Sequence, residues 1–165
     1  MFYELTHSLN PSDLQLNEGD RLSFPSHLHG SFEFIVITSG ECTVTVDKKV
    51  YRVTPEAAVL VFPNQVHSME SPTPNTFFSC IFSSGHVKAF SEFAYQNLPV
   101  SNLFTLPQDL LDDLRTLRRE DRLVHIKSTL YRLVDCFDRT AEYQCRGKSD
   151  ETLLAKIFDL SLIHI

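Results

Sequence analysis

The sequence predicts a mainly β protein whose C-terminal part is helical. From Arg21 to about Phe82, short runs of β-forming residues alternate with Gly, Pro, Asn and Asp, which is typical of a sandwich or a barrel. After Gly85, apolar residues recur every three or four positions, which is the period of an amphipathic helix. A chain of 165 residues can bury a core without disulfides, so we expect one β domain with a helical appendage.

Composition and charge exclude several classes of function. The 42% hydrophobic and 22% charged residues are typical of a soluble globular protein. The sequence has no membrane-length apolar run and no cleavable leader, so we expect a cytoplasmic protein without membrane contact. Its four cysteines form no CxxC pair, which favours reduced thiols. The net charge of −6 argues against direct DNA binding, because proteins that bind phosphates have a basic face.

The β region, residues 21–84, is expected to follow an N-terminal arm, residues 1–20, that holds only a short strand near Phe2–Leu5. We expect the main strands at residues 31–38, 42–46, 50–53, 58–62, 66–69 and 76–82. The turns between them carry polar residues, proline or glycine, at Ser39–Gly40 and at residues 47–49, 54–56, 63–65 and 71–75. This rhythm predicts the β domain.

The helical region begins with a helix expected over residues 86–98. In the next segment, Thr105–Gln108 resembles a capping box with proline inside the first helical turn. A helix bearing Leu110, Leu114 and Leu117 should follow it. We expect residues 99–146 to be mainly helical.

The longest predicted helix runs from about residue 122 to residue 143. Its apolar residues are spaced alternately three and four apart, at Leu123, Ile126, Leu130, Leu133 and Phe137. This seam suits packing along another helix, as in a dimer, and equally suits docking onto the barrel. Two heptads do not decide between these alternatives.

Three histidines and one glutamate form the most specific feature of the sequence. His27 and His29 are two residues apart, so on an extended segment both side chains leave the same face. Glu33 opens the next strand, and His67 follows a Pro-Asn turn on another strand. If the four converge, they suit a divalent metal such as Zn, Fe, Mn or Ni. Alternatively they hydrogen-bond to one another or contact an organic effector.

A barrel of this size has room inside for one small ligand. The residues that we expect to contact it are Phe24, His27, His29, Glu33, Ile35, Val44 and His67. Other inward-facing residues are expected at Ile37, Cys42, Val46, Val59 and Val61, with Phe62, Phe78 and Phe82 as further walls.

These motifs carry a resemblance to a known family. The run His27-x-His29-x₃-Glu33-x₆-Gly40 resembles the first cupin motif, and Pro63-Asn64-x₂-His67 resembles the second. The whole stretch is similar to the N-terminal sensing domain of AraC-type transcription regulators. The resemblance implies a cupin barrel (a double-stranded β-helix or jelly roll) followed by two or three helices.

The sequence departs from the cupin motifs at five positions while keeping all four potential ligands. Arg21, Glu56 and Asn64 stand where the family has glycine, Phe62 stands where it has proline, and Ser71 stands where it has asparagine. Asn64 can adopt the left-handed conformation that this turn needs. The departures weaken the case for a catalytic cupin and leave the case for the fold intact.

The resemblance implies an effector-binding and dimerisation domain of a transcription regulator, in which residues 99–146 would be the linker and dimerisation helices. The effector would be a sugar, an organic acid or an aromatic compound, the protein a homodimer, and the arm a lid. DNA would be bound only by a helix-turn-helix domain, of which residues 147–165, with the apolar run Leu153–Leu160, would be the truncated start.

Two alternatives remain open. The first is a metal-dependent cupin enzyme, such as a dioxygenase, isomerase or epimerase. Such an enzyme needs a further acid or base, and the sequence offers none beyond Glu33 and Glu41, of which Glu41 is expected in an exposed turn. The second is a purely structural dimerisation module, which leaves the histidine cluster without a purpose.

Overall fold

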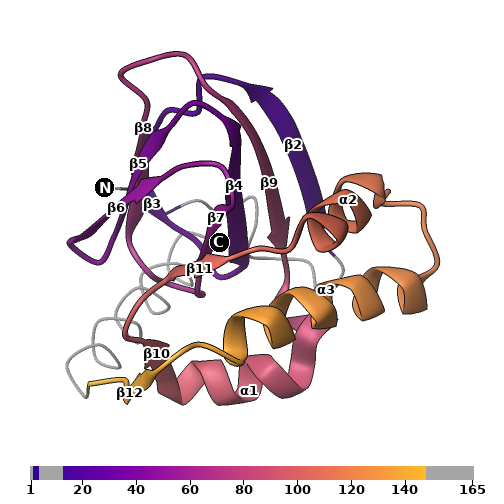
Figure 1. Cartoon of the computed structure of the whole chain (residues 1–165). Helices are drawn as coiled ribbons and strands as arrows, with labels where there is room; N and C mark the ends of the chain where they lie inside the picture. The colour runs from indigo at the N-terminus through magenta and orange to yellow at the C-terminus, as the bar shows by residue number, and fades with distance from the viewer. Residues whose placement is uncertain (1, 4–12, 148–165) are drawn as a thin grey trace.

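A computed structural model of the chain describes residues 2–3 and 13–147. It has three layers: two facing β-sheets, and helices packed against the outer side of one of them (Figure 1). The predicted mainly β architecture with helices toward the C-terminal end is confirmed. No helix in the described part of the chain is long and apolar enough to cross a membrane.

The first sheet has the strand order β1-β3-β8-β5-β6. Its strands are β1 (Phe2–Tyr3), β3 (Phe24–Leu28), β8 (His67–Glu70), β5 (Cys42–Val46) and β6 (Lys49–Val53). β1 runs parallel to β3, and the other neighbours are antiparallel.

The second sheet has the order β11-β7-β4-β9-β2 and is antiparallel throughout. Its strands are β11 (Leu103–Thr105), β7 (Ala57–Val61), β4 (Phe32–Ser39), β9 (Thr76–Phe82) and β2 (Leu14–Asp20). This sheet is the middle layer of the molecule, so both of its faces are buried.

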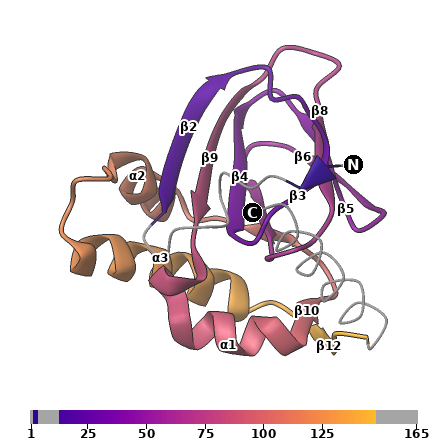
Figure 2. The same ribbon diagram turned by 180° about the vertical axis from the view of Figure 1, so that it is seen from behind.

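The helical layer contains the 3₁₀ turn η2 (Ser84–Val87) and the helices α1 (Lys88–Gln96), α2 (Gln108–Thr116) and α3 (Leu123–Asp138). Between and after the helices, β10 (Asn97–Pro99) pairs antiparallel with β12 (Tyr143–Cys145). Seen from behind, α1 and α3 lie together below the sheets, and α2 lies beside the end of β2 (Figure 2).

Two apolar cores result from the alternation of side chains along the strands. The inner core lies between the sheets and comprises Leu22, Ile35, Ile37, Cys42, Val44, Val46, Val53, Val59, Val61 and Met69. The outer core lies between the second sheet and the helices, and it includes Phe34, Val36, Phe62, Phe78 and Phe82. Because β4 contributes to both cores, its sequence is an almost unbroken apolar run.

The prediction of a loose arm was wrong for residues 14–20. These residues form β2, which pairs with β9 from Leu14 opposite Phe82 to Asp20 opposite Thr76. The alternation of Leu14 and Leu16 with polar residues is a strand signal. The rest of the predicted arm, residues 4–12, lies outside the described residues, as do residues 148–165 and the run Leu153–Leu160.

Helix boundaries also differ from the predictions. The capping box at Thr105 was wrong, because Thr105 pairs with Ala57 in the sheet and Pro107 is the N-cap of α2. The first helix ends at Gln96, and the long helix ends at Asp138. Strand pairing takes Asn97 and Leu98 from the first predicted helix and Tyr143 from the long one, and a turn at Arg139–Thr140 ends the long helix before that strand.

The apolar seam of α3 packs within its own chain. Ile126, Leu130, Leu133 and Phe137 are buried in the outer core, whereas Leu123 is 52% exposed. The docking alternative is therefore confirmed for the four buried residues. They are not available as a dimer interface.

Three departures from the cupin motifs retain the backbone conformation that glycine normally provides. Arg21, Glu56 and Asn64 have φ angles of 63°, 79° and 66°. The predicted left-handed conformation of Asn64 is confirmed. Neighbouring packing and hydrogen bonds therefore hold side-chain-bearing residues in a conformation that costs them energy.

Candidate functional site

His27, His29, Glu33 and His67 come together between the two sheets. His27 and His67 are directly opposite each other on β3 and β8 of the first sheet, and Glu33 projects from β4 of the second. All four residues are buried, and one potential ligand atom from each lies within 4.8 Å of the others. The convergence that the sequence predicted is therefore present.

Glu33 is the centre of the hydrogen bonding in this cluster. Its Oε2 lies 3.0 Å from Nε2 of His29 and 3.0 Å from Nε2 of His67. Burial by itself raises the pKa of Glu33, but the hydrogen bonds from His29 and His67 outweigh it and lower the pKa to about 2. The carboxylate is therefore ionised inside the protein.

Backbone carbonyls fix the other ring nitrogen of each histidine. Nδ1 lies 2.9 Å from the oxygen of Pro25 in His27, 3.1 Å from that of Ser31 in His29, and 2.9 Å from that of Gln65 in His67. A carbonyl only accepts hydrogen bonds, so each Nδ1 carries a proton. This arrangement orients imidazoles in metal sites.

The donor set fits a divalent cation. With Nδ1 protonated, a neutral imidazole presents a lone pair at Nε2, so in His29 and His67 that lone pair faces the carboxylate of Glu33. A cation between these acceptors would use both lone pairs and the carboxylate. Burial, followed by repulsion from His67, lowers the pKa of His27 and favours its neutral form, which a metal requires. Three nitrogens and one oxygen suit Zn, Fe, Mn or Ni.

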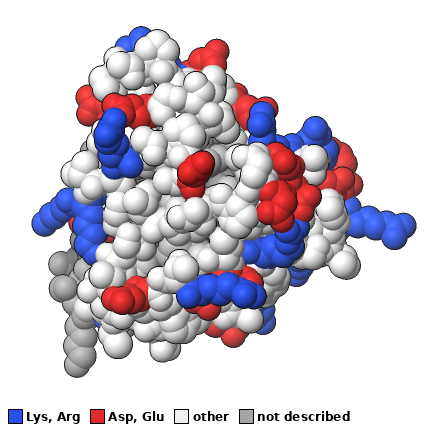
Figure 3. All heavy atoms as spheres, in the orientation of Figure 1, with Lys and Arg blue, Asp and Glu red and all other residues white. Residues whose placement is uncertain are grey.

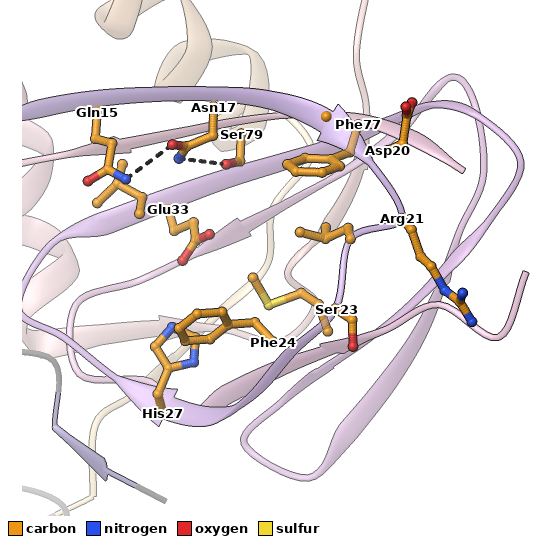
Figure 4. Close-up of a pocket in the computed structure, with 14 residues that line it drawn as sticks. Gln15, Asn17, Asp20, Arg21, Ser23, Phe24, His27, Glu33, Phe77 and Ser79 are labelled. Atoms are coloured by element: carbon orange, nitrogen blue, oxygen red, sulfur yellow. Dashed lines mark hydrogen bonds between the residues drawn. The ribbon is translucent and has the colours of Figure 1, made fainter. Parts of the chain in front are cut away.

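A cavity of about 400 Å³ opens beside the cluster, with Glu33 and His27 in its lining. In Figure 4 the carboxylate of Glu33 points into the space between Gln15, Asn17 and Ser79 on one side and Phe24 and His27 on the other. The complete lining is Gln15, Asn17, Gly19, Asp20, Arg21, Leu22, Ser23, Phe24, His27, Glu33, Met69, Phe77, Ser79 and Ile81.

One polar wall of the cavity was missed by the sequence analysis. Gln15 donates a hydrogen bond to Asn17 (3.1 Å), which donates another to Ser79 (3.3 Å). The register of β2 and β9 places Asn17 opposite Ser79, on the inward face. The alternation in Leu14–Asn17 could have revealed the strand, but not the strand that it pairs with.

The other predicted contact residues occupy different places. Phe24 lines the cavity, whereas Ile35 and Val44 are fully buried in the inner core and do not line it. Phe62, Phe78 and Phe82 were expected as further walls, and this was wrong: all three belong to the outer core. Their side chains point to the helical face of the second sheet.

The N-terminal strand lies against His27. Phe2 stacks on the ring of His27 at a centroid distance of 5.8 Å and an interplanar angle of 24°. It also contacts Phe24, at 6.1 Å. The described part of the predicted arm thus lies next to the cluster.

Comparisons with known proteins agree with this geometry. The AraC-like ligand binding domain family matches residues 11–134. Among solved structures, ToxT from Vibrio cholerae superimposes with a TM-score of 0.51 and 11% identity, over 76% of this chain and 57% of that chain. A cupin protein from Bacteroides fragilis gives a TM-score of 0.40 and 16% identity, over 44% of this chain and 67% of that one. Curated proteins give no significant sequence match.

The two facing sheets and the converging His/Glu cluster define a cupin-type β-barrel. The chain belongs to the AraC-like ligand binding domain family, as the resemblance implied. It spans little more than half the length of ToxT.

Proposed function

We propose that this chain is the effector-sensing part of a cytoplasmic transcription regulator. A small molecule binds in the cavity next to Glu33 and His27 and controls a helix-turn-helix domain that binds DNA. The observation that carries this proposal is a cavity of about 400 Å³ beside a buried polar cluster, in a chain of a ligand-binding domain family. Such a volume is in the range of small-molecule pockets.

The lining of the cavity supports a ligand with both polar and apolar parts. Amide and hydroxyl groups of Gln15, Asn17 and Ser79 lie across the cavity from the apolar side chain of Phe24, and Met69 also lines it. A sugar, an organic acid and an aromatic compound each offer groups for such a lining, so all three classes belong in a screen.

The test is a thermal-shift screen of sugars, organic acids and aromatic acids against the wild-type chain and Asn17→Leu. A ligand that binds only the folded chain raises Tm by an amount that grows with the ratio of ligand concentration to its dissociation constant. We expect Asn17→Leu to abolish the shift that a true ligand produces. Asn97→Leu is the matched control, because Asn97 lies in β10, is not part of the cavity lining, and its side-chain amide donates to the Phe93 carbonyl. Identical shifts in all three proteins would contradict binding in this cavity.

We further propose that the four-residue cluster binds one divalent metal ion. When bound, the metal would supply a positive charge that could orient an oxygen-bearing ligand at the inner end of the cavity. Metal analysis after loading with Zn²⁺, Mn²⁺, Fe²⁺ or Ni²⁺ should find about one ion per chain, and none in His27→Ala or His67→Ala. His125→Ala is the control, because His125 is an exposed residue of α3. Absence of metal under every loading condition would remove this proposal.

A metal-dependent cupin enzyme is the second candidate, favoured by the same convergent ligands. Its general acid or base would have to come from Asp20 or Glu33, the carboxylic acids in the cavity lining. In Figure 4 the side chain of Asp20 points away from Glu33. A metal-free wild-type protein would exclude this candidate, whereas effector binding without turnover would favour the regulator.

The homodimer is also a proposal, and it must use a surface other than the buried seam of α3. Val124 and Tyr131 are exposed on that helix at 80% and 37%. Gel filtration of the chain should show a dimer, and Val124→Lys should shift it to a monomer if this face is the interface.

A further inference from the structure

The turn Phe62–Gln65, between β7 and β8, contacts two of the four cluster residues. The backbone oxygen of Gln65 accepts the hydrogen bond from Nδ1 of His67 at 2.9 Å. The backbone N–H of Asn64 donates to the oxygen of His29 at 2.8 Å. The turn thus fixes the imidazole ring of His67 and the backbone of His29.

The side chain of Gln65 points away from the cluster into a buried network. Its Oε1 accepts hydrogen bonds from the N–H of Phe62 at 2.9 Å and from Nδ2 of Asn102 at 2.7 Å. Its Nε2 donates to Asp47 at 2.9 Å. Gln65 is 4% exposed and Asn102 1% exposed. A buried amide that is left without a hydrogen-bond partner costs its full desolvation free energy. We therefore expect the side chains of Gln65 and Asn102 to move together.

Asn102 connects this network to the end of the helical layer. Asn102 lies three residues after β10, and β10 pairs with β12, the next strand after α3 in the chain. The N–H of Val100 also donates to the oxygen of Glu142 at 2.8 Å. Hydrogen bonds therefore join His67 to Gln65 and Gln65 to Asn102. From Asn102 the backbone leads two residues back to Val100, which is hydrogen-bonded to Glu142 in the segment that follows α3.

We propose that Gln65 is a positioning residue that couples occupancy of the His27/His29/Glu33/His67 cluster to residues 97–102 and to β12. The inference rests on the sensing role proposed above and names the route by which binding reaches the helices. Occupancy favours one orientation of His67, and Gln65 transmits that preference because its backbone fixes the ring while its side chain holds Asn102. Coupling of this kind is reciprocal, so disturbing Asn102 also weakens binding at the cluster.

Gln65→Met and Asn102→Ala test the route from its two sides. Gln65→Met keeps the side-chain length and the backbone oxygen but removes the side-chain hydrogen bonds. Gln108→Met is the matched control, since Gln108 lies on α2 and its amide donates to Asp112 on the surface. Zn²⁺ is the probe, and its affinity is measured by competition with a chromophoric chelator. We expect about tenfold weaker binding in Gln65→Met and Asn102→Ala, which is the low end for residues that support metal ligands, and no change in the control.

Amide hydrogen exchange at residues 97–102 and 143–145 provides the second measurement. We expect Zn²⁺ to slow exchange there in the wild-type chain and in Gln108→Met, and to have no effect in Gln65→Met or Asn102→Ala. A merely structural role would lower stability but leave the Zn²⁺ affinity and the Zn²⁺-dependent protection unchanged, and that result would overturn the proposal. If Gln65→Met fails to fold, Asn102→Ala decides, because it lies outside the cluster.

Hydrogen exchange measured without metal distinguishes failure of this proposal from failure of the proposed metal site. We expect His67→Ala, without metal, to accelerate exchange at residues 97–102, and Asn102→Ala to remove that difference. Acceleration in His67→Ala, together with a wild-type chain that binds none of the four metals, would refute the metal site and support the coupling. Unchanged exchange at residues 97–102 in His67→Ala would refute the coupling, even if the wild-type chain binds Zn²⁺.

Discussion

At the scale of single residues, Glu33 determines the electrostatics of the buried cluster. It is 3% exposed and accepts hydrogen bonds from two imidazoles, which keep it ionised. A buried carboxylate without such partners would be neutral. Its charge therefore depends on His29 and His67 as much as on its own surroundings.

The stability of the metal-free chain should consequently depend on pH through Glu33. Its pKa falls from an ordinary 4.5 to about 2 on folding. Its stabilising contribution is complete above about pH 4.5 and is lost as the pH falls toward 2, by at most about 1.4 kcal/mol per pH unit. Urea unfolding with a chelator present, between pH 5 and pH 3, measures this slope. Glu33→Gln should reduce it, whereas Glu41→Gln, at an exposed ion pair with Arg52, should not. An unchanged slope in Glu33→Gln would contradict the assignment.

Gly40 is required by the turn between β4 and β5. Its φ is +78°, and a Cβ there would lie 2.7 Å from the oxygen of Pro74. We expect Gly40→Ala to lower the free energy of unfolding by about 2 kcal/mol or more, from backbone strain and this clash. At Gly19 a Cβ would meet the ring of Phe77 at 3.2 Å, without a positive φ. Gly19→Ala should therefore cost less than half as much in urea unfolding, and equal losses would show that strain is not the cause.

At the scale of elements, the hairpin from β5 to β6 shows how backbone conformation selects residue types. Its two turn residues, Asp47 and Lys48, have φ angles of 46° and 72°. Two consecutive positive φ angles define a type I′ turn, which glycine fits best at the second position.

Lys48→Gly should therefore stabilise the chain by about 0.5–1 kcal/mol, because glycine adopts a positive φ without strain. Chemical denaturation measures the change. Lys49→Gly is the control and should destabilise, since Lys49 is the first residue of β6. A loss of stability in Lys48→Gly would mean that the lysine side chain contributes more than its strained backbone costs.

Helix α3 stabilises the folded chain through the face that covers the second sheet. Leu133 is fully buried on that face, whereas Val124 is 80% exposed on the opposite one. Leu133→Ala should lower the free energy of unfolding by about 3 kcal/mol, the usual cost of a buried leucine cavity. Val124→Ala should change it by less than about 0.5 kcal/mol. Thermal and urea unfolding at low protein concentration test both; similar effects from the two substitutions would contradict this orientation of the helix.

At the scale of the whole molecule, the distribution of charge bears on whether this chain can bind DNA by itself. The net charge is −6, and on the face shown in Figure 3 acidic and basic side chains are interspersed. Phosphate binding requires a concentration of positive charge. That face offers no large basic patch.

Residues 1–165 should therefore show no binding to duplex DNA at about 150 mM salt, where even non-specific binders retain dissociation constants of roughly 10⁻⁴–10⁻⁶ M. Fluorescence anisotropy with a labelled random duplex, with and without an effector from the thermal-shift screen, is the measurement. Micromolar binding that weakens steeply with salt would contradict the proposal that DNA is bound by a separate helix-turn-helix domain.

The sequence by itself determined the strand rhythm of the barrel and the identity of its four converging polar residues. Period-two alternation and turn residues act locally, so they can be read from neighbouring positions. His27 and His29 share a face for the same local reason. The left-handed turn at Asn64 was readable from the resemblance to the cupin motif, because asparagine adopts this conformation where the family has glycine.

Only the tertiary structure decided which partner each element has. The pairing of β2 with β9 brought Gln15 and Asn17 into the cavity wall, and the same kind of pairing took Thr105 out of the predicted helix. The seam of α3 fits a sheet as well as it fits a second helix, and burial against the second sheet settled the choice. These outcomes depend on contacts between residues far apart in the chain, which no local pattern encodes.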